Sequence, residues 1–221
     1  MGEPAVSAEL LAVVVAMVHG EPCVLVLGEP PRLPAGPLMP GDHSLQAATR
    51  AWVEEQTGRA LGYVEQLYTF VDLDHDADDQ RLSVSYLGLT TPATDVGIGR
   101  WLPWYDLMPW EDRRADTVVL DALEPALDAW ASAEPGLAEA RRQRCAITFG
   151  LAGQPWQPDL VLQRYELLYE VGLVPESPAA WRLPEASLAP GRRMLGDHRR
   201  VVATGLARLR SKIQYRPVVL E

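Results

Sequence analysis

The stretch that decides the fold runs from Leu33 to Gly58 and reads LPAGPLMPGDHSLQAATRAWVEEQTG. Its first part holds several prolines, which break regular strands and helices, and leads into Gly36 as an extended loop. Asp42 or Ser44 then caps a helix that runs to about Thr57 and is closed by the glycine at 58. The segment therefore predicts a glycine-containing loop followed by a short helix.

Two adjacent carboxylates, Glu54 and Glu55, lie near the end of this helix. Mg²⁺ takes oxygen ligands and activates water, so a site that hydrolyses diphosphate linkages supplies carboxylates from a few close positions. Glutamates at i, i+3 and i+4 would share one helix face, and a preceding glycine lets the backbone approach a phosphate. The pattern indicates a metal site with Glu54 and Glu55 as candidate ligands, and a close approach of the backbone to a phosphate at Gly36.

The segments around this helix alternate between apolar and polar residues in the manner of strands. Strands are predicted at 9–19, 23–27, 63–71 and 81–90, with a turn at Gly20-Glu21-Pro22 that makes the first two a hairpin. An acidic loop over 72–79 joins the last two strands.

After Thr94 the spacing of apolar residues changes from the alternation of strands to the period of helices. Helices are predicted at about 117–133, 137–148, 158–171 and 198–211, with a proline-rich loop over 174–191. A strand-like apolar stretch, 213–220, stops one residue before the end and suggests a continuation beyond it. We therefore expect three segments: a core over 1–110, a helical insertion over 111–190, and a closing helix and strand over 191–221.

Composition excludes several classes of protein. The net charge is −10, yet residues 191–221 carry eight Lys and Arg against two acids and are +6, which leaves −16 on the rest. A body this acidic repels phosphate backbones, so the chain by itself should bind nucleic acid poorly. The longest apolar run, Leu10–Val18, is too short to cross a membrane. Two distant cysteines, Cys23 and Cys145, fit buried reduced thiols and a cytoplasmic protein.

The stretch 33–58 resembles the Nudix box, G-x5-E-x7-R-E-U-x-E-E-x-G-U, where U is a bulky apolar residue. Anchored on Gly36, the match places Asp42, Arg50, Ala51 and the pair Glu54-Glu55 on the successive E, R, E and EE positions. This match implies that Asp42 is a further metal ligand and that Arg50 contacts the bound ligand. Anchored on Gly58, it shifts by one residue, so that Trp52 takes the glutamate position beside the arginine and Glu55-Gln56 take the pair. Both registers lack the glutamate beside the arginine, and the sequence does not choose between them. A missing ligand of a hard cation should weaken metal binding, unless Asp42, Glu65 or an acid of 72–79 replaces it.

Two further stretches are similar to Nudix-related transcriptional regulators of NAD metabolism. They are YVEQLYTF (63–70) with RLSVSYLGL (81–89), and GDHRRVVATGLARLRSKIQYRPVVLE (196–221). The texture of 103–114 and 163–174 is more like a proteobacterial branch with a helical insertion. The resemblance implies an α+β fold, an α/β/α sandwich with a Nudix-like mixed sheet. It also implies an ADP-ribose-like ligand, a homodimer, and DNA contact through a C-terminal winged helix that would follow residue 221.

Several other residues carry alternative interpretations. Arg81 can pair with a ligand phosphate or with the acidic loop. Tyr68, Phe70 and Tyr86 can stack on a ligand ring or fill the core. Three tryptophans and the pair Asp197-His198 fit packing and structural roles; the tryptophans are Trp101, Trp104 and Trp110.

Three functions follow as hypotheses. The first is a ligand-sensing domain of a regulator with little or no hydrolysis of its nucleotide. The second is an active, Mg²⁺-dependent pyrophosphatase that uses Glu54 and Glu55 on ADP-ribose or a related nucleoside diphosphate. The third is an interaction module whose helical insertion binds a partner.

Overall fold

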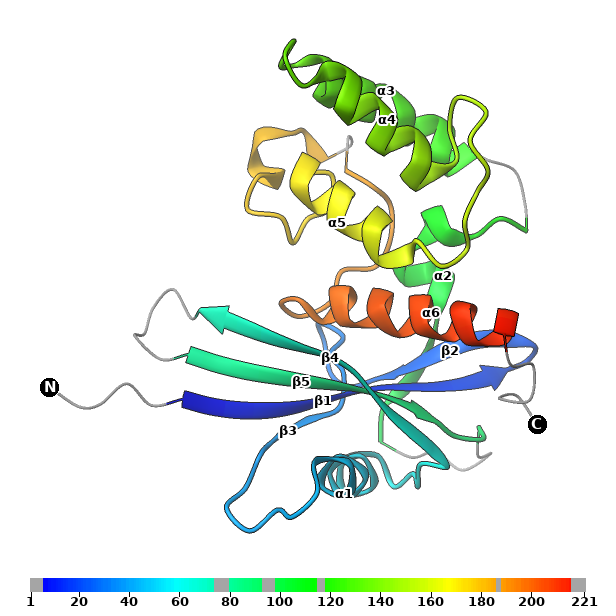
Figure 1. Ribbon diagram of the computed structural model, residues 1–221. Coiled ribbons are helices and arrows are strands. Elements are labelled where there is room, and N and C mark those ends of the chain that lie inside the picture. Colours follow the sequence, from blue (N-terminus) through cyan, green and yellow to red (C-terminus); the bar gives the residue numbers. More distant parts are fainter. Residues whose placement is uncertain (1–5, 74–79, 93–97, 115–117, 186–187, 216–221) are drawn as a thin grey trace, which may run out of the picture. The chain divides into compact units, whose positions relative to one another are not determined.

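The computed structural model describes residues 6–73, 80–92, 98–114, 118–185 and 188–215. The chain forms two compact units, Met1–Trp104 and Tyr105–Glu221. The first unit contains the sheet, and the second contains most of the helices (Figure 1).

The first unit is built on a six-stranded mixed sheet. Its strands are β1 (Val6–Val18), β2 (Glu21–Val26), β3 (Ala35–Pro37), β4 (Tyr63–Leu73), β5 (Gln80–Leu89) and β6 (Arg100–Pro103). Their order is β4-β5-β1-β2-β6, and β3 also pairs with β1. β1 and β5 run parallel, while the other pairings are antiparallel. The expected α+β class with a mixed sheet is confirmed, and the short strands β3 and β6 are additions to the prediction.

The β1–β2 hairpin turns one residue earlier than the sequence predicted. His19 and Gly20 both have positive φ, 50° and 81°, and Val18 pairs with Glu21 across the turn. Positive φ at both central residues is the geometry of a type I′ turn, whose twist matches that of the flanking strands. The prediction of a turn over 20–22 was wrong in its last two residues, because Glu21 and Pro22 already pair with β1 and belong to β2.

Helix α1 (Leu45–Thr57) covers one face of this sheet and confirms the helix predicted for the deciding stretch. Every second residue of β1 and β5 points toward α1, as strand alternation requires. The buried cluster formed there is Leu10, Ala12, Val14, Leu25, Ala48, Val53, Leu61, Val64, Val84 and Tyr86. A lone two- or three-stranded ribbon could not bury these side chains, so helix and sheet stabilise each other.

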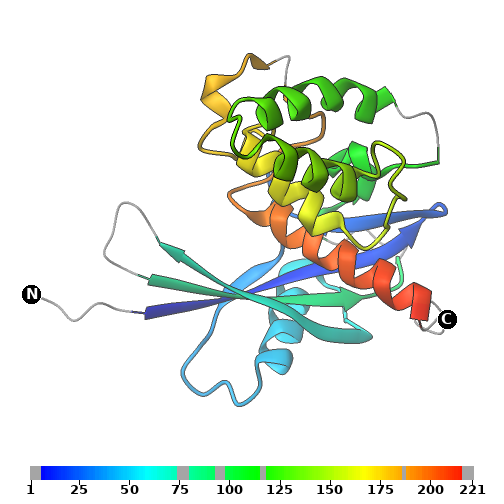
Figure 2. The same ribbon diagram turned by 45° about the horizontal axis from the view of Figure 1, so that its top comes forward.

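The second unit is helical, and its first helix begins at Trp104, the last residue of the first unit. Its elements are α2 (Trp104–Leu107), η1 (Pro109–Glu111), α3 (Val118–Ser132), α4 (Ala138–Phe149), α5 (Val161–Val171), η2 (Ala180–Arg182) and α6 (His198–Tyr215). Helix α3 packs against α4, and α5 packs against α6 (Figures 1 and 2). Helix α6 continues to Tyr215, so residues 213–215 of the predicted strand 213–220 are helical; the rest of that stretch lies outside the described residues.

Both cysteines are free thiols and are buried, Cys23 in β2 and Cys145 in α4. Burial raises the pKa of the Cys145 thiol, because a thiolate is poorly solvated among apolar groups. We therefore expect a thiol-specific reagent at pH 8 to label neither cysteine in the native protein and to label both in denaturant. Mass spectrometry of the labelled chain measures this. Rapid native labelling of either thiol would contradict the buried placement.

Candidate functional site

Helix α1 is closed at both ends by its own sequence. The hydroxyl of Ser44 accepts a hydrogen bond from the backbone N–H of Ala47 at 3.3 Å. Gly58 has φ 67° and donates its N–H to the carbonyl oxygen of Glu54 at 2.8 Å, which is a left-handed C-cap. Ser44 is thus the cap, and Asp42 instead accepts a hydrogen bond from the N–H of Met39 at 2.9 Å in the preceding turn.

This capping bears on the register of the box-like stretch. Val53 is 1% exposed, and Gly58 closes the helix in the left-handed conformation that glycine adopts without strain. Both features agree with the register anchored on Gly58, which puts an apolar residue at 53 and the closing glycine at 58. In that register the three carboxylate positions are held by Trp52, Glu55 and Gln56.

Trp52 and Gln56 are turned to β3 and hold it against the helix. The indole Nε1 of Trp52 donates to the carbonyl oxygen of Pro37 at 3.1 Å. The amide of Gln56 makes two hydrogen bonds to Ala35: its Nε2 donates to the carbonyl oxygen at 2.5 Å, and its Oε1 accepts from the N–H at 3.2 Å. We call these two side chains the β3 brace. The brace occupies with neutral groups two positions where a metal site would need carboxylates.

Gly36 lies under this brace. A Cβ atom at position 36 would stand 2.3 Å from Cδ2 of Trp52, so only glycine leaves room for the indole. Gly36 is buried, and its missing side chain accommodates Trp52. The predicted use of this glycine, close approach of backbone to a phosphate, competes with that packing.

Arg50 also has structural partners. Its guanidinium donates to the carbonyl oxygens of Leu61 and Gly62, the second at 3.0 Å. One turn earlier, the Nε2 of Gln46 donates to the carbonyl oxygen of Val64 at 2.6 Å. The arginine predicted to contact the ligand therefore links α1 to the segment that precedes β4.

The acids predicted as metal ligands do not converge. Glu54, Glu55 and Asp42 are all exposed, and Glu65 accepts a hydrogen bond from the hydroxyl of Tyr63 at 2.8 Å. Among the residues that the structure describes, no group of three or more His, Cys, Asp or Glu side chains could hold a metal ion. Residues 74–79 of the predicted acidic loop 72–79 lie outside those residues, and its first two residues belong to β4. The side chains present on α1 do not fit the Mg²⁺ that the box would need.

The other predicted ligand residues lie on β4 and β5. Tyr68 is 56% exposed and Phe70 is half-buried, with their ring centroids 5.4 Å apart. Tyr86, in contrast, is 3% exposed in the cluster beneath α1, and burial raises the pKa of its hydroxyl. Tyr86 is therefore a core residue. Arg81 pairs through its backbone with Ser7 and Asp72, and its side chain lies outside the described part of the chain.

The sequence-predicted residues thus form two separate groups. Residues 82, 84 and 86 of β5 face α1, so the alternate positions 83 and 85 face the opposite side of the sheet. Phe70 pairs with Ser83 and belongs to that opposite face. The group around α1 and the group of Tyr68 and Phe70 are consequently on different faces of one sheet.

The three tryptophans were expected to pack in the helical part, but Trp101 of β6 packs against the cluster beneath α1 instead. Trp104 and Trp110 are buried, and Trp101 is half-buried with the guanidinium of Arg59 5.5 Å from its ring centroid. Of the pair at the start of α6, Asp197 lies 3.8 Å from the guanidinium of Arg200.

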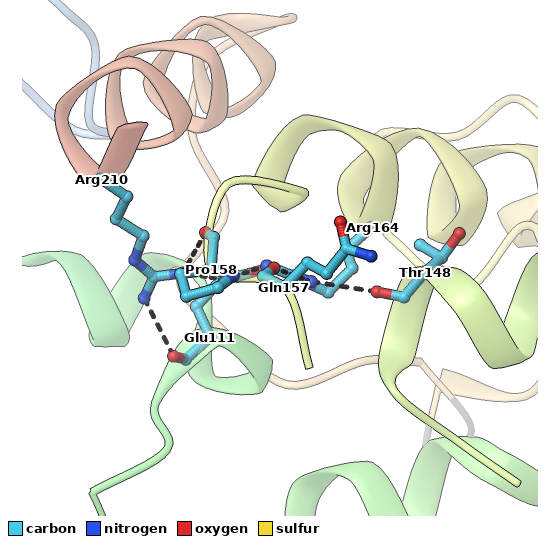
Figure 3. A network of polar contacts seen from close by, with 6 residues as sticks. All are labelled: Glu111, Thr148, Gln157, Pro158, Arg164 and Arg210. Carbon is cyan, nitrogen blue, oxygen red and sulfur yellow. Dashed lines mark hydrogen bonds and ion pairs between the residues drawn. The ribbon is translucent and has the colours of Figure 1, made fainter. Parts of the chain in front are cut away.

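An ion-pair network inside the helical unit was not foreseen (Figure 3). Arg164 and Glu111 are both fully buried, and the arginine donates to both carboxylate oxygens, at 2.5 and 3.0 Å. The remaining nitrogen of Arg164 donates to the carbonyl oxygens of Thr148 and Gln157. Arg210 of α6 reaches the same carboxylate from the other side. One signal was present in the sequence: Arg164 falls at i+3 from Val161 and i−4 from Leu168, on the apolar stripe of its helix.

A second buried pair anchors the start of α6. Arg199 donates to the carboxylate of Glu176 at 2.7 Å and to the carbonyl oxygen of Leu107 at 3.2 Å. Arg200 next to it makes two hydrogen bonds to Glu166 of α5, at 2.5 and 2.9 Å. Three basic residues of α6, Arg199, Arg200 and Arg210, are therefore bound to acids of their own unit.

Comparison with known proteins returns structures and no sequence family. No family model matches the chain, and no curated protein matches it. The NUDIX domain of Shewanella oneidensis NrtR, solved in complex with ADP ribose, is similar over 48% of this chain and 79% of its own, with 22% identity and a TM-score of 0.41. A crystal structure of S. oneidensis NrtR covers 73% of this chain and 84% of its own, with 22% identity and a TM-score of 0.39. A MutT/nudix family protein from Enterococcus faecalis covers 47% and 45%, with 23% identity and a TM-score of 0.37.

These solved structures are of the class that the sequence motifs resemble. Their TM-scores lie below 0.5, so the roles given to residues of this chain follow from its own contacts.

Within the described residues, no helix is long and apolar enough to cross a membrane.

Proposed function

We propose that this chain is a ligand-sensing protein whose first unit is Nudix-like, and that it binds an ADP-ribose-like nucleotide without hydrolysing it. The observation that supports the proposal is the β3 brace. Hydrolysis at such a site depends on carboxylates that hold a divalent cation and activate water. Trp52 and Gln56 supply an indole and an amide instead, and both are committed to hydrogen bonds with β3.

The ligand class is proposed from the motifs 63–70, 81–89 and 196–221, which are similar to regulators of NAD metabolism. On the same ground we propose a cytoplasmic homodimer in which segment 196–221 passes a ligand signal to a winged helix that contacts DNA. Helix α6 suits that role because its anchor residues, Arg199 and Arg210, tie it to the loops and helices of its unit.

Calorimetric titration with ADP-ribose, with and without Mg²⁺, tests this proposal, together with chromatography for released AMP. We expect binding in the micromolar range, about −8 kcal/mol, with little dependence on Mg²⁺ and no AMP. AMP produced at an ordinary enzyme rate, about 1 per second or faster, would establish the pyrophosphatase instead. If the chain binds neither ADP-ribose nor related nucleotides, the result would support the third hypothesis, an interaction module.

A further inference from the structure

Strand β4 is irregular at one point, and hydrogen bonds from the neighbouring strand fix its backbone there. Gln66 pairs with Tyr86 and Thr69 pairs with Val84, so three steps along β4 oppose two along β5. The extra residue makes a β-bulge at 67–68. Bulges redirect side chains and are frequent beside functional sites.

Ser85 fixes this bulge from the neighbouring strand. It is fully buried, and its hydroxyl accepts a hydrogen bond from the N–H of Tyr68 at 3.1 Å and donates one to the carbonyl oxygen of Tyr68 at 2.8 Å. A buried hydroxyl is costly unless it is hydrogen-bonded, and here both backbone groups of a single residue satisfy it. The backbone of Tyr68 is therefore held in one position although it departs from the regular ladder.

The side chain that this arrangement presents is aromatic and open to solvent. Tyr68 is 56% exposed, and the ring of Phe70 lies beside it at 5.4 Å with a tilt of 34°. We call these two rings the β4 aromatic pair. The fixed backbone and the exposed ring together present an aromatic face with a hydroxyl at its edge, and the cost of ordering the backbone at Tyr68 is already met in the free protein.

We propose that the β4 aromatic pair is the stacking surface for the planar heteroaromatic ring of a nucleotide. The inference rests on the proposed function and deepens it, because it places the ring on the sheet face opposite α1. Aromatic side chains stack on nucleobases, and removing such a side chain typically weakens binding by a factor of about 10 to 100. The indole of Trp52 in the box-like stretch is committed to β3, because it covers Gly36 and donates to the carbonyl oxygen of Pro37.

The chain contains two phenylalanines, Phe70 and Phe149, which makes a direct reporter possible. Phe149 is 1% exposed and belongs to α4, so it serves as an internal reference. The full chain labelled with 4-fluorophenylalanine should give two ¹⁹F resonances, assigned with Phe70→Leu. Titration with ADP-ribose should shift the Phe70 resonance and leave that of Phe149 in place. Ribose 5-phosphate, which carries no aromatic ring, should shift neither.

Matched variants measure the contribution of the ring. Tyr68→Ala should weaken ADP-ribose binding roughly tenfold or more, whereas Tyr68→Phe should retain it. Tyr63→Ala is the control, because Tyr63 is an exposed tyrosine on the same strand, at 38%. Unchanged affinity of Tyr68→Ala together with a silent Phe70 resonance would overturn the stacking site while the proposed function stands. A Tyr68→Ala variant that keeps its affinity but loses self-association would also overturn it, in favour of a contact between copies. A wild-type chain that does not bind ADP-ribose would overturn both.

Discussion

Replacing Arg164 by methionine is expected to lower the free energy of unfolding by about 3–5 kcal/mol, because it leaves a fully buried carboxylate without its principal partner. Arg164 donates four of its hydrogen bonds inside the helical unit, two to Glu111 and two to backbone carbonyls. Burial lowers the pKa of the Arg164 guanidinium, with the Glu111 contact acting against that shift. Because arginine starts from a very high pKa, it stays charged at neutral pH. Urea denaturation followed by circular dichroism at 222 nm measures the loss.

The double variant Arg164→Met, Glu111→Gln separates the buried charge from the packing. It should recover part of the stability, because no uncompensated carboxylate then remains. Arg210→Met should cost clearly less than Arg164→Met, since Glu111 keeps its buried partner. Arg142→Met is the surface control, because Arg142 and Asp128 are both at least half exposed and 3.5 Å apart. Equal losses for Arg164 and Arg142 would show that the network does not stabilise the unit.

Introducing carboxylates at the brace should create a metal site on α1, where the described side chains form none. The double variant Trp52→Glu, Gln56→Glu places acids at 52 and 56 beside the natural Glu55, so three carboxylates share one helix face at i, i+3 and i+4. Affinity for a hard cation rises with the number of charged oxygen ligands, so we expect Mn²⁺ to bind roughly tenfold or more tightly than to the natural chain. Electron paramagnetic resonance of free Mn²⁺ measures the binding.

This gain should come with a loss of stability. Without the indole against Gly36 and the amide hydrogen-bonded to Ala35, β3 loses its contacts with α1. Loss of the buried part of the tryptophan is expected to lower the free energy of unfolding by about 3–5 kcal/mol. The variant Trp52→Ala, Gln56→Ala is the matched control, because it loses the brace and gains no carboxylate. If both double variants bind Mn²⁺ alike, or if the natural chain already binds it as tightly, the brace is not what excludes the metal.

Much of the fold was predictable because local patterns decide local structure. The helix over 45–57 followed from its cap and closing glycine, and the long strands followed from alternation of apolar residues. The strand at 35–37 was missed because its neighbouring prolines indicated a loop. It exists because β1 offers an open edge at Glu9–Leu11 and because two helix side chains hold it there.

The candidate site was less predictable than the fold. The sequence showed that a carboxylate was missing from the box, and it left two registers open. Burial of Val53 and the left-handed Gly58 agree with one of them. No spacing rule could have shown that Trp52 and Gln56 hydrogen-bond to β3, since that contact joins residues 15 and 21 positions apart.

The sequence by itself determined the longer helices and strands, since capping, periodicity and prolines act over a few residues. It did not determine the short strands β3 and β6. It also determined that the helix over 45–57 carries too few acids for the usual metal site. Only the tertiary structure decided what the remaining residues do there. Hydrogen-bond partners and burial depend on which distant segments meet. As a result, Gly36 packs against an indole, Arg50 donates to two carbonyl oxygens, and the side chain of Tyr68 is exposed to solvent.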